Sequence, residues 1–193
     1  MKRSLFLICL GSFFTFGQSD FILSDLDSSK GDYAKVAMQI WEYAEMGYQE
    51  EKSTALLQSK LKEAGFSVLS GVAGIPTAFI AEYNNGGPII AILGEYDALP
   101  GLSQKALPYK VTNGARGGHA CGHHLFGTAS AAAAISLKKY IEKYKVKGTI
   151  RYYGCPAEEG GSGKVYMTRA GLFDDVDIVL HWHSDDENSA NPR

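Results

Sequence analysis

The chain has 193 residues, with 19 Lys and Arg against 21 Asp and Glu, and a formal net charge of −2 at pH 7. Hydrophobic residues make up 45% and charged residues 21%, an ordinary globular composition that excludes a disordered chain and favours a single domain. The near-zero net charge indicates no nucleic-acid partner, and three cysteines are too few for a disulfide scaffold.

The N-terminus has the pattern of a secretory signal peptide. Lys2 and Arg3 precede an apolar run over 5–16, and small residues stand just before Gln18. The run is shorter than the ~20 residues of a membrane span, so we expect no stable membrane anchor. The pattern predicts a signal peptide over 1–17 and an exported protein, periplasmic or secreted. An uncleaved N-terminal helix is the alternative.

Two helices and two strands are predicted next. Apolar residues recur at helical spacing over 32–46, and a second helix runs from Ser53, as N-cap, to a stop at Gly65. The segments 77–83 and 89–93 are rich in β-forming residues. Because Asn-Asn-Gly-Gly lies between them, we expect a β-hairpin.

The second half of the chain alternates helix and strand. An Ala-rich helix is predicted over 124–144, a strand over 149–153, and a short helix that ends near Gly171 after a Gly-rich turn. The apolar segment 177–182 predicts a buried strand. The sequence therefore predicts an α/β fold in which helices flank a mixed β-sheet, with the hairpin as its antiparallel part.

Side chains that carry chemistry gather near predicted strand ends, where open α/β sheets build their sites. Cys121 and His123 would point the same way in an extended segment just before the long helix. A thiolate and an imidazole together suit zinc. The nearby helix N-terminus would help to keep Cys121 ionised.

Two adjacent carboxylates form the second cluster. Glu158 and Glu159 repel each other unless a cation neutralises one, which would leave the other as a general base. His183, after the last predicted strand, can add a neutral nitrogen ligand. Three alternatives stay open: a disulfide between Cys121 and Cys155, a nucleophilic Cys121 thiol, and a solvated turn at the glutamates.

Four motifs together resemble a known family. They are GEYDALP at 94–100, GHACGH at 118–123, CPAEEGGSGK at 155–164, and Trp-His at 182–183. The first motif alone would be typical of a strand end with solvated acids. In this order and spacing the motifs resemble the di-metal amidohydrolases, relatives of the aminoacylases and carboxypeptidases. Within that family the resemblance is strongest to the p-aminobenzoyl-glutamate hydrolases.

The resemblance implies a zinc-exopeptidase-like catalytic domain with two divalent metal ions, zinc as first choice and manganese as second. Cys121 would bridge the two ions. His123 and His183 would bind one ion, and Glu159 would bind the other.

The resemblance also implies an activity. Glu158 would be the general base that takes a proton from a water between the ions, and Asp97 would orient a ligand imidazole. The expected substrate is a small N-acyl amino acid or dipeptide-like compound, such as aminobenzoyl-glutamate. Its amide bond would be hydrolysed.

The resemblance covers 32–183, which would be the N-terminal part of the catalytic domain. Relatives continue into an inserted lid and dimerisation domain and then return with a final metal-binding histidine. We therefore expect 184–193 to begin a loop toward that domain, in a truncated chain. Through the missing domain the chain would form a homodimer or join a related subunit. The alternatives are a non-catalytic metal-binding fragment or partner subunit, and a thiol hydrolase.

Overall fold

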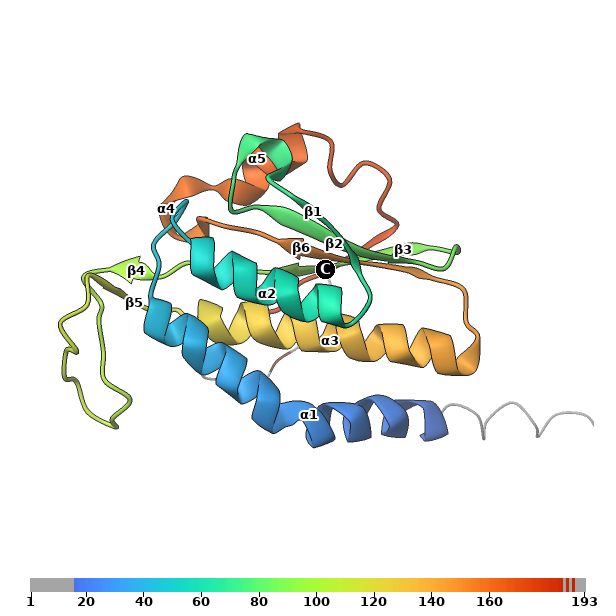
Figure 1. Cartoon of the computed structure of the whole chain (residues 1–193), viewed down its shortest axis with the longest axis horizontal. Helices are drawn as coiled ribbons and strands as arrows, with labels where there is room; N and C mark the ends of the chain where they lie inside the picture. The colour runs from blue at the N-terminus through green and yellow to red at the C-terminus, as the bar shows by residue number, and fades with distance from the viewer. Residues whose placement is uncertain (1–15, 186, 188, 190–193) are drawn as a thin grey trace, which may run out of the picture.

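The computed structural model describes residues 16–185, 187 and 189. The predicted signal peptide lies outside these residues, except that positions 16 and 17 open the first helix. Helix α1 (Phe16–Tyr43) packs along α3 (His123–Tyr144), and α2 (Glu51–Glu63) lies against both (Figure 1). Among the helices of the described residues, none combines the length and the apolar character needed to span a membrane.

Helix α1 begins well before its predicted start and ends at Tyr43. Phe21 packs against two tyrosine rings at the end of α3, and Asp25 forms a 2.7 Å ion pair with Lys139. The stretch 25–32 is rich in Ser, Asp and Gly, which are weak helix formers. Contacts with α3 therefore decide the start of this helix, and local propensity does not reveal it.

The main sheet has five strands in the order β1-β2-β6-β3-β7. Its strands are β1 (Ser67–Ser70), β2 (Phe79–Asn84), β3 (Ile89–Gly94), β6 (Thr149–Gly154) and β7 (Ile178–Leu180). The pairs β1–β2 and β2–β6 are antiparallel, whereas β3 runs parallel to both β6 and β7. The predicted mixed sheet is confirmed.

The predicted hairpin is wrong, because β6 lies between β2 and β3. Neighbouring strands lie ~4.8 Å apart, so the turn at 85–88 must cross a gap of roughly 10 Å. The Asn85 side chain donates to the Val146 carbonyl at 2.8 Å, and Thr149 N–H donates to the Pro88 carbonyl at 2.9 Å. The turn residues thus bond to the chain that enters β6 instead of closing a two-stranded hairpin.

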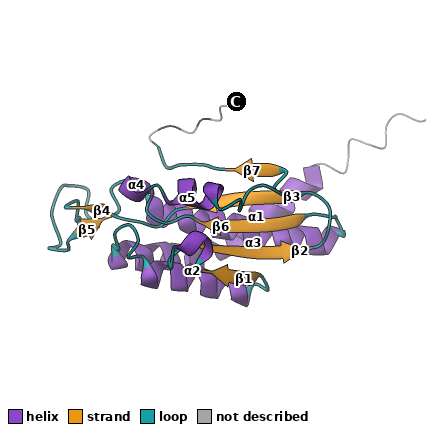
Figure 2. Ribbon diagram, turned by 90° about the horizontal axis from the view of Figure 1, so that it is seen from above, coloured by secondary structure: helices purple, strands orange, loops and turns teal. Residues whose placement is uncertain are grey.

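Helices cover both faces of the sheet (Figures 1 and 2). Five shorter elements complete the fold: the 3-10 helix η1 (Val72–Gly74), β4 (Leu99–Pro100), β5 (Gly117–Gly118), α4 (Glu158–Gly161) and α5 (Gly163–Arg169). Alternate strand residues enter two cores: Ile92 and Tyr152 face α1–α3, and Leu93 and Tyr153 face the α5 side.

The start of α2 differs from its prediction. The helix begins at Glu51, so Ser53 lies inside it and is not the N-cap. The carboxylate of Glu45 instead accepts the N–H groups of Lys52 at 3.0 Å and Ser53 at 2.8 Å. A negative charge at this end satisfies free N–H groups and complements the helix dipole.

Strand β7 forms where the sequence predicts a strand, but the prediction that it is buried is wrong. Ile178, Val179 and Leu180 are 46%, 50% and 50% exposed. The strand pairs with β3 on one side and forms the edge of the sheet in the described part of the chain. The apolar run therefore predicts the strand correctly, but it does not predict whether other elements bury that strand.

Candidate metal centre

The carboxyl ends of three parallel strands meet the N-terminus of α3 at one edge of the sheet. Strand β3 is followed by Glu95 and Asp97, β6 by the pair at 158–159, and β7 by His183, while α3 starts at His123. Open α/β sheets place their sites at such strand ends. All six predicted site residues therefore belong to the same edge of the sheet.

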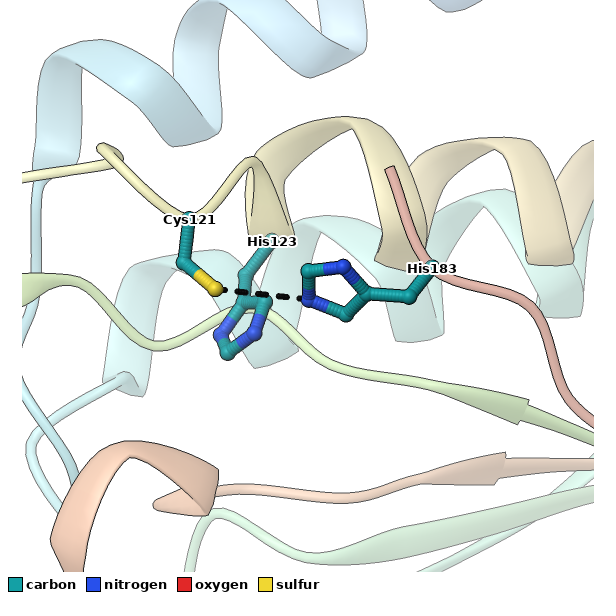
Figure 3. Close-up of side chains that lie close together, drawn as sticks. All are labelled: Cys121, His123 and His183. Carbon is teal, nitrogen blue, oxygen red and sulfur yellow. Dashed lines mark hydrogen bonds between the residues drawn. The ribbon is translucent and has the colours of Figure 1, made fainter. Parts of the chain in front are cut away.

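Cys121, His123 and His183 bring their ligand atoms within 4.8 Å of one another (Figure 3). The sulfur of Cys121 lies 3.3 Å from His183 Nε2. His183 Nδ1 donates to the Ser184 carbonyl at 2.7 Å, which leaves Nε2 with a lone pair directed at the thiol. One sulfur and two imidazoles are a donor set that suits zinc.

Gly122 turns the chain between the first two of these residues. It is the N-cap of α3 and has a φ of 83°, in the left-handed region that favours glycine. Cys121 and His123 therefore converge through a tight turn, and the prediction that they share an extended segment is wrong. A side chain at 122 would also press against Ser184 Oγ.

Asp97 holds two of the predicted ligand residues in place. Its side chain is fully buried, and Oδ1 lies 2.8 Å from His123 Nδ1. Oδ2 accepts the backbone N–H of Glu159 at 2.9 Å. Since Nδ1 of His123 is engaged, Nε2 is the nitrogen that faces the site.

The two adjacent glutamates lie beside the same nitrogen but differ in exposure. Glu159 is 18% exposed, its Oε1 lies 4.0 Å from His123 Nε2, and its carboxylate contacts the Cys121 thiol. Glu158 is 46% exposed, and its Oε2 lies 3.8 Å from His123 Nε2. Glu159 thus joins Cys121, His123 and His183 in what we term the ligand cluster, and Glu158 lies at its solvent edge.

Two residues that sequence reasoning missed hold the segment 157–161. The Ala157 N–H donates to the Glu50 carboxylate at 2.8 Å, and the Tyr48 hydroxyl donates to the Gly161 carbonyl. Glu50 is fully buried, and this burial raises the pKa of its carboxyl. Each contact joins positions more than 100 residues apart (separations of 107 and 113), so no local pattern could have marked it.

The electrostatics of the site favour a positive charge at its centre. Burial lowers the pKa of His123, but the carboxylates of Asp97 and Glu95 outweigh it and raise this pKa to about 10. Burial and the neighbouring Glu159 raise the pKa of the Cys121 thiol to about 11. Without a bound cation the effect of these groups on the thiol is larger than that of the helix N-terminus, which was predicted to help keep Cys121 ionised. A cation among these groups would lower the pKa of the thiol and favour the thiolate.

The structure bears on three of the alternative readings of these clusters. Cys121 and Cys155 are both free thiols, so the predicted alternative of a disulfide is wrong. A nucleophilic cysteine needs a lowered pKa, so the raised pKa of Cys121 argues against this alternative, which the assay proposed below tests. The acids of the GEYDALP motif are not solvated, since Glu95 and Asp97 are 2% and 1% exposed, whereas Glu158 of the second pair is 46% exposed.

The remaining histidines do not join the ligand cluster. His119 Nε2 lies 3.0 Å from the Ile40 carbonyl, and the ring of His124 packs on that of His119 at a centroid distance of 5.1 Å. Burial lowers the pKa of both histidines to about 4. His181 packs edge-on against Phe126.

The residues present fit a divalent metal ion. Three polar atoms are buried near the centre: Glu95 Oε2 and His123 Nε2, which lie 2.9 Å apart as an ion pair, and Glu159 Oε1, which has no hydrogen-bond partner. Buried polar atoms are normally paired, and each of these can donate an electron pair to a cation. With the thiol of Cys121 and the imidazole of His183, they form a mixed nitrogen, oxygen and sulfur donor set.

The fold and this site define the class of α/β domain found in dinuclear metallopeptidases. The solved structure of the Bacillus subtilis YXEP protein, a dinuclear metal-binding peptidase of the M20 family, matches with a TM-score of 0.68 and 26% identity. The match covers 82% of this chain and 44% of that one. A model of peptidase family M20/M25/M40 matches residues 91–193, and the chain belongs to this family.

Two curated relatives of the chain are amide hydrolases by name. The chain is 52% identical over 166 residues to a subunit of the p-aminobenzoyl-glutamate hydrolase of Escherichia coli (strain K12), covering 84% of this chain and 34% of that protein. It is 32% identical over 165 residues to hippurate hydrolase of Campylobacter jejuni, covering 84% and 42%. The predicted resemblance is confirmed. The chain spans about a third to two fifths of the length of these relatives.

Proposed function

We propose that the chain is the N-terminal part of the catalytic domain of a metal-dependent amidohydrolase. Its substrates would be N-acyl or aminobenzoyl amino acids, with aminobenzoyl-glutamate as first candidate. The observation that carries the proposal is the convergence of a thiol, two imidazoles and a carboxylate at the strand ends. The name of the E. coli relative supports the choice of substrate.

The ligand cluster would hold two divalent ions, with zinc as first choice and manganese as second. Cys121 would bridge them, His123 and His183 would bind one, and Glu159 would bind the other. The thiolate favours zinc over harder ions. When bound, the ions would polarise the scissile amide carbonyl and lower the pKa of a water molecule.

Glu158 is placed to act as the general base. Its carboxylate lies at the solvent edge of the cluster and within 3.8 Å of His123 Nε2. From there it can take a proton from a water molecule and pass it to the leaving nitrogen, a role typically worth 10²–10⁴-fold in rate. Asp97 would not touch substrate. It would keep the His123 ring and the Glu159 backbone in position.

Export and assembly are further parts of the proposal. The basic and apolar pattern over 1–17 supports removal of a signal peptide and a periplasmic or secreted location. Because the E. coli relative is named as one subunit of its hydrolase, we propose a related subunit as partner, with a homodimer as the alternative.

The experiment combines metal binding with hydrolysis. The purified 193-residue chain is titrated with Zn²⁺, dialysed and assayed for metal content, and then tested for cleavage of aminobenzoyl-glutamate with and without a chelator. We expect bound metal and chelator-sensitive cleavage. Glu158→Gln should keep its metal and lose cleavage by roughly 10²–10⁴-fold. Glu142→Gln is the matched control, since Glu142 is also 46% exposed but lies on α3 beside Lys138.

Other results of this experiment would favour a different function or refute the site. Metal without turnover would favour the non-catalytic metal-binding partner. Cleavage that survives the chelator but is lost on thiol alkylation would favour a thiol hydrolase. A chain that binds no divalent ion would refute the proposed site.

A further inference from the structure

Glu95 is a buried carboxylate that none of the proposed roles uses. It follows β3 directly, and its side chain is 2% exposed. Its Oε1 forms an ion pair with Lys164, and His181 Nε2 lies 3.8 Å from the same oxygen. One oxygen of the carboxylate is therefore already balanced by a cationic side chain.

The other oxygen faces the site. Glu95 Oε2 lies 2.9 Å from His123 Nε2, and the two buried atoms form an ion pair when Nε2 carries a proton. Nδ1 of His123 is committed to Asp97, so in a neutral ring Nε2 carries a lone pair. Two buried electron-pair donors this close need a positive charge between them, which a proton supplies in the metal-free chain and a divalent ion would supply in its place.

The two atoms are close enough to share one metal ion. Zinc binds imidazole nitrogen and carboxylate oxygen at ~2.0–2.2 Å in tetrahedral geometry, so two such ligands lie about 3.4 Å apart, and the observed 2.9 Å would need to widen by only about 0.5 Å. The carboxylate of Glu158, the proposed general base, lies beside them, and atoms of the three groups fall within 4.8 Å of one another.

We propose that Glu95 supplies Oε2 as a ligand to the cation that His123 binds, and that Lys164 is a positioning residue that holds Oε1. Lys164 also balances part of the negative charge of the site, so that the carboxylate can stay ionised while buried. The inference rests on the proposed metal site and adds to it an oxygen ligand from the end of β3.

The test is calorimetric titration of the 193-residue chain with Zn²⁺ alone. Glu95→Gln keeps the shape of the side chain and removes its charge, and we expect its affinity for Zn²⁺ to fall at least tenfold, roughly the minimum cost of losing a group that supports a metal. Glu95→Asp keeps the charge but is one methylene shorter. It should show a comparable loss, and it serves as the second variant if Glu95→Gln does not fold.

Glu82→Gln is the matched control. Glu82 is also a carboxylate paired with a cationic side chain, Arg151 at 2.5 Å, but it lies on β2 away from the site. Removing the charge of Glu82 should leave the affinity for Zn²⁺ unchanged. Lys164→Met should lower the melting temperature of the metal-free chain, and added Zn²⁺ should recover most of that loss, because the ion replaces the missing positive charge beside Glu95.

The outcomes separate this inference from the proposed function. If the wild-type chain binds no Zn²⁺, the metal site itself fails. If the wild-type chain binds Zn²⁺ and Glu95→Gln binds it as tightly as Glu82→Gln does, Glu95 is no ligand and the inference alone is overturned. A Lys164→Met variant that stays equally destabilised with and without Zn²⁺ would remove the positioning role of Lys164.

Discussion

Replacement of Asp97 by asparagine tests how the site is held together. The buried carboxylate accepts two hydrogen bonds, from His123 Nδ1 and from Glu159 N–H. An asparagine has one carbonyl oxygen, so one donor would face an amide N–H₂ group instead. A buried donor left without an acceptor costs about 1–3 kcal/mol of folding free energy.

The same change should weaken metal binding. Residues that orient a metal ligand typically contribute 10–100-fold to affinity, which corresponds to about 1.4–2.7 kcal/mol. We therefore expect Asp97→Asn to lower both the free energy of unfolding, measured by urea denaturation, and the affinity for Zn²⁺, measured by calorimetry.

A second aspartate provides the control. Asp177 also accepts a backbone N–H, from Ile89 at 2.8 Å, but it precedes β7 at the opposite end of the sheet. Asp177→Asn should leave the affinity for Zn²⁺ unchanged. If Asp97→Asn matched Asp177→Asn in both measurements, Asp97 would not orient His123, and the reasoning would fail.

Two further substitutions test the surroundings of the site. Burial raises the pKa of Glu50, so the folded chain binds this proton more tightly than the unfolded chain, and stability falls as pH rises from the ordinary glutamate pKa to the raised one. Glu50→Gln cannot ionise, so its unfolding free energy relative to wild type should increase from acid to neutral pH. Urea denaturation of both proteins across that pH range measures this difference in unfolding free energy. A difference that does not change with pH would contradict the prediction. Gly127→Ala would place a Cβ against the Glu95 carbonyl and should lower the free energy of unfolding by about 1–3 kcal/mol. Gly31→Ala, in open space on α1, should be neutral or stabilising. Thermal unfolding of both variants tests this difference.

Local patterns in the sequence determined the elements that depend on a few neighbouring residues. The helix predicted over 124–144 is confirmed as α3, and the strand over 149–153 as β6. The motifs that carry the family resemblance lie at strand ends, and the parallel strands bring those ends to one edge. Periodicity and turn chemistry suffice here, because they reflect the backbone preferences of short segments.

The tertiary structure alone decided which segments became neighbours. The insertion of β6 between β2 and β3 depends on pairing with both strands, and no property of the turn at 85–88 encodes it. The burial of Glu95 and Glu50 likewise depends on partners far away in the chain. Such contacts are selected by the summed free energy of packing and pairing over the whole domain, which a local stretch of sequence does not contain.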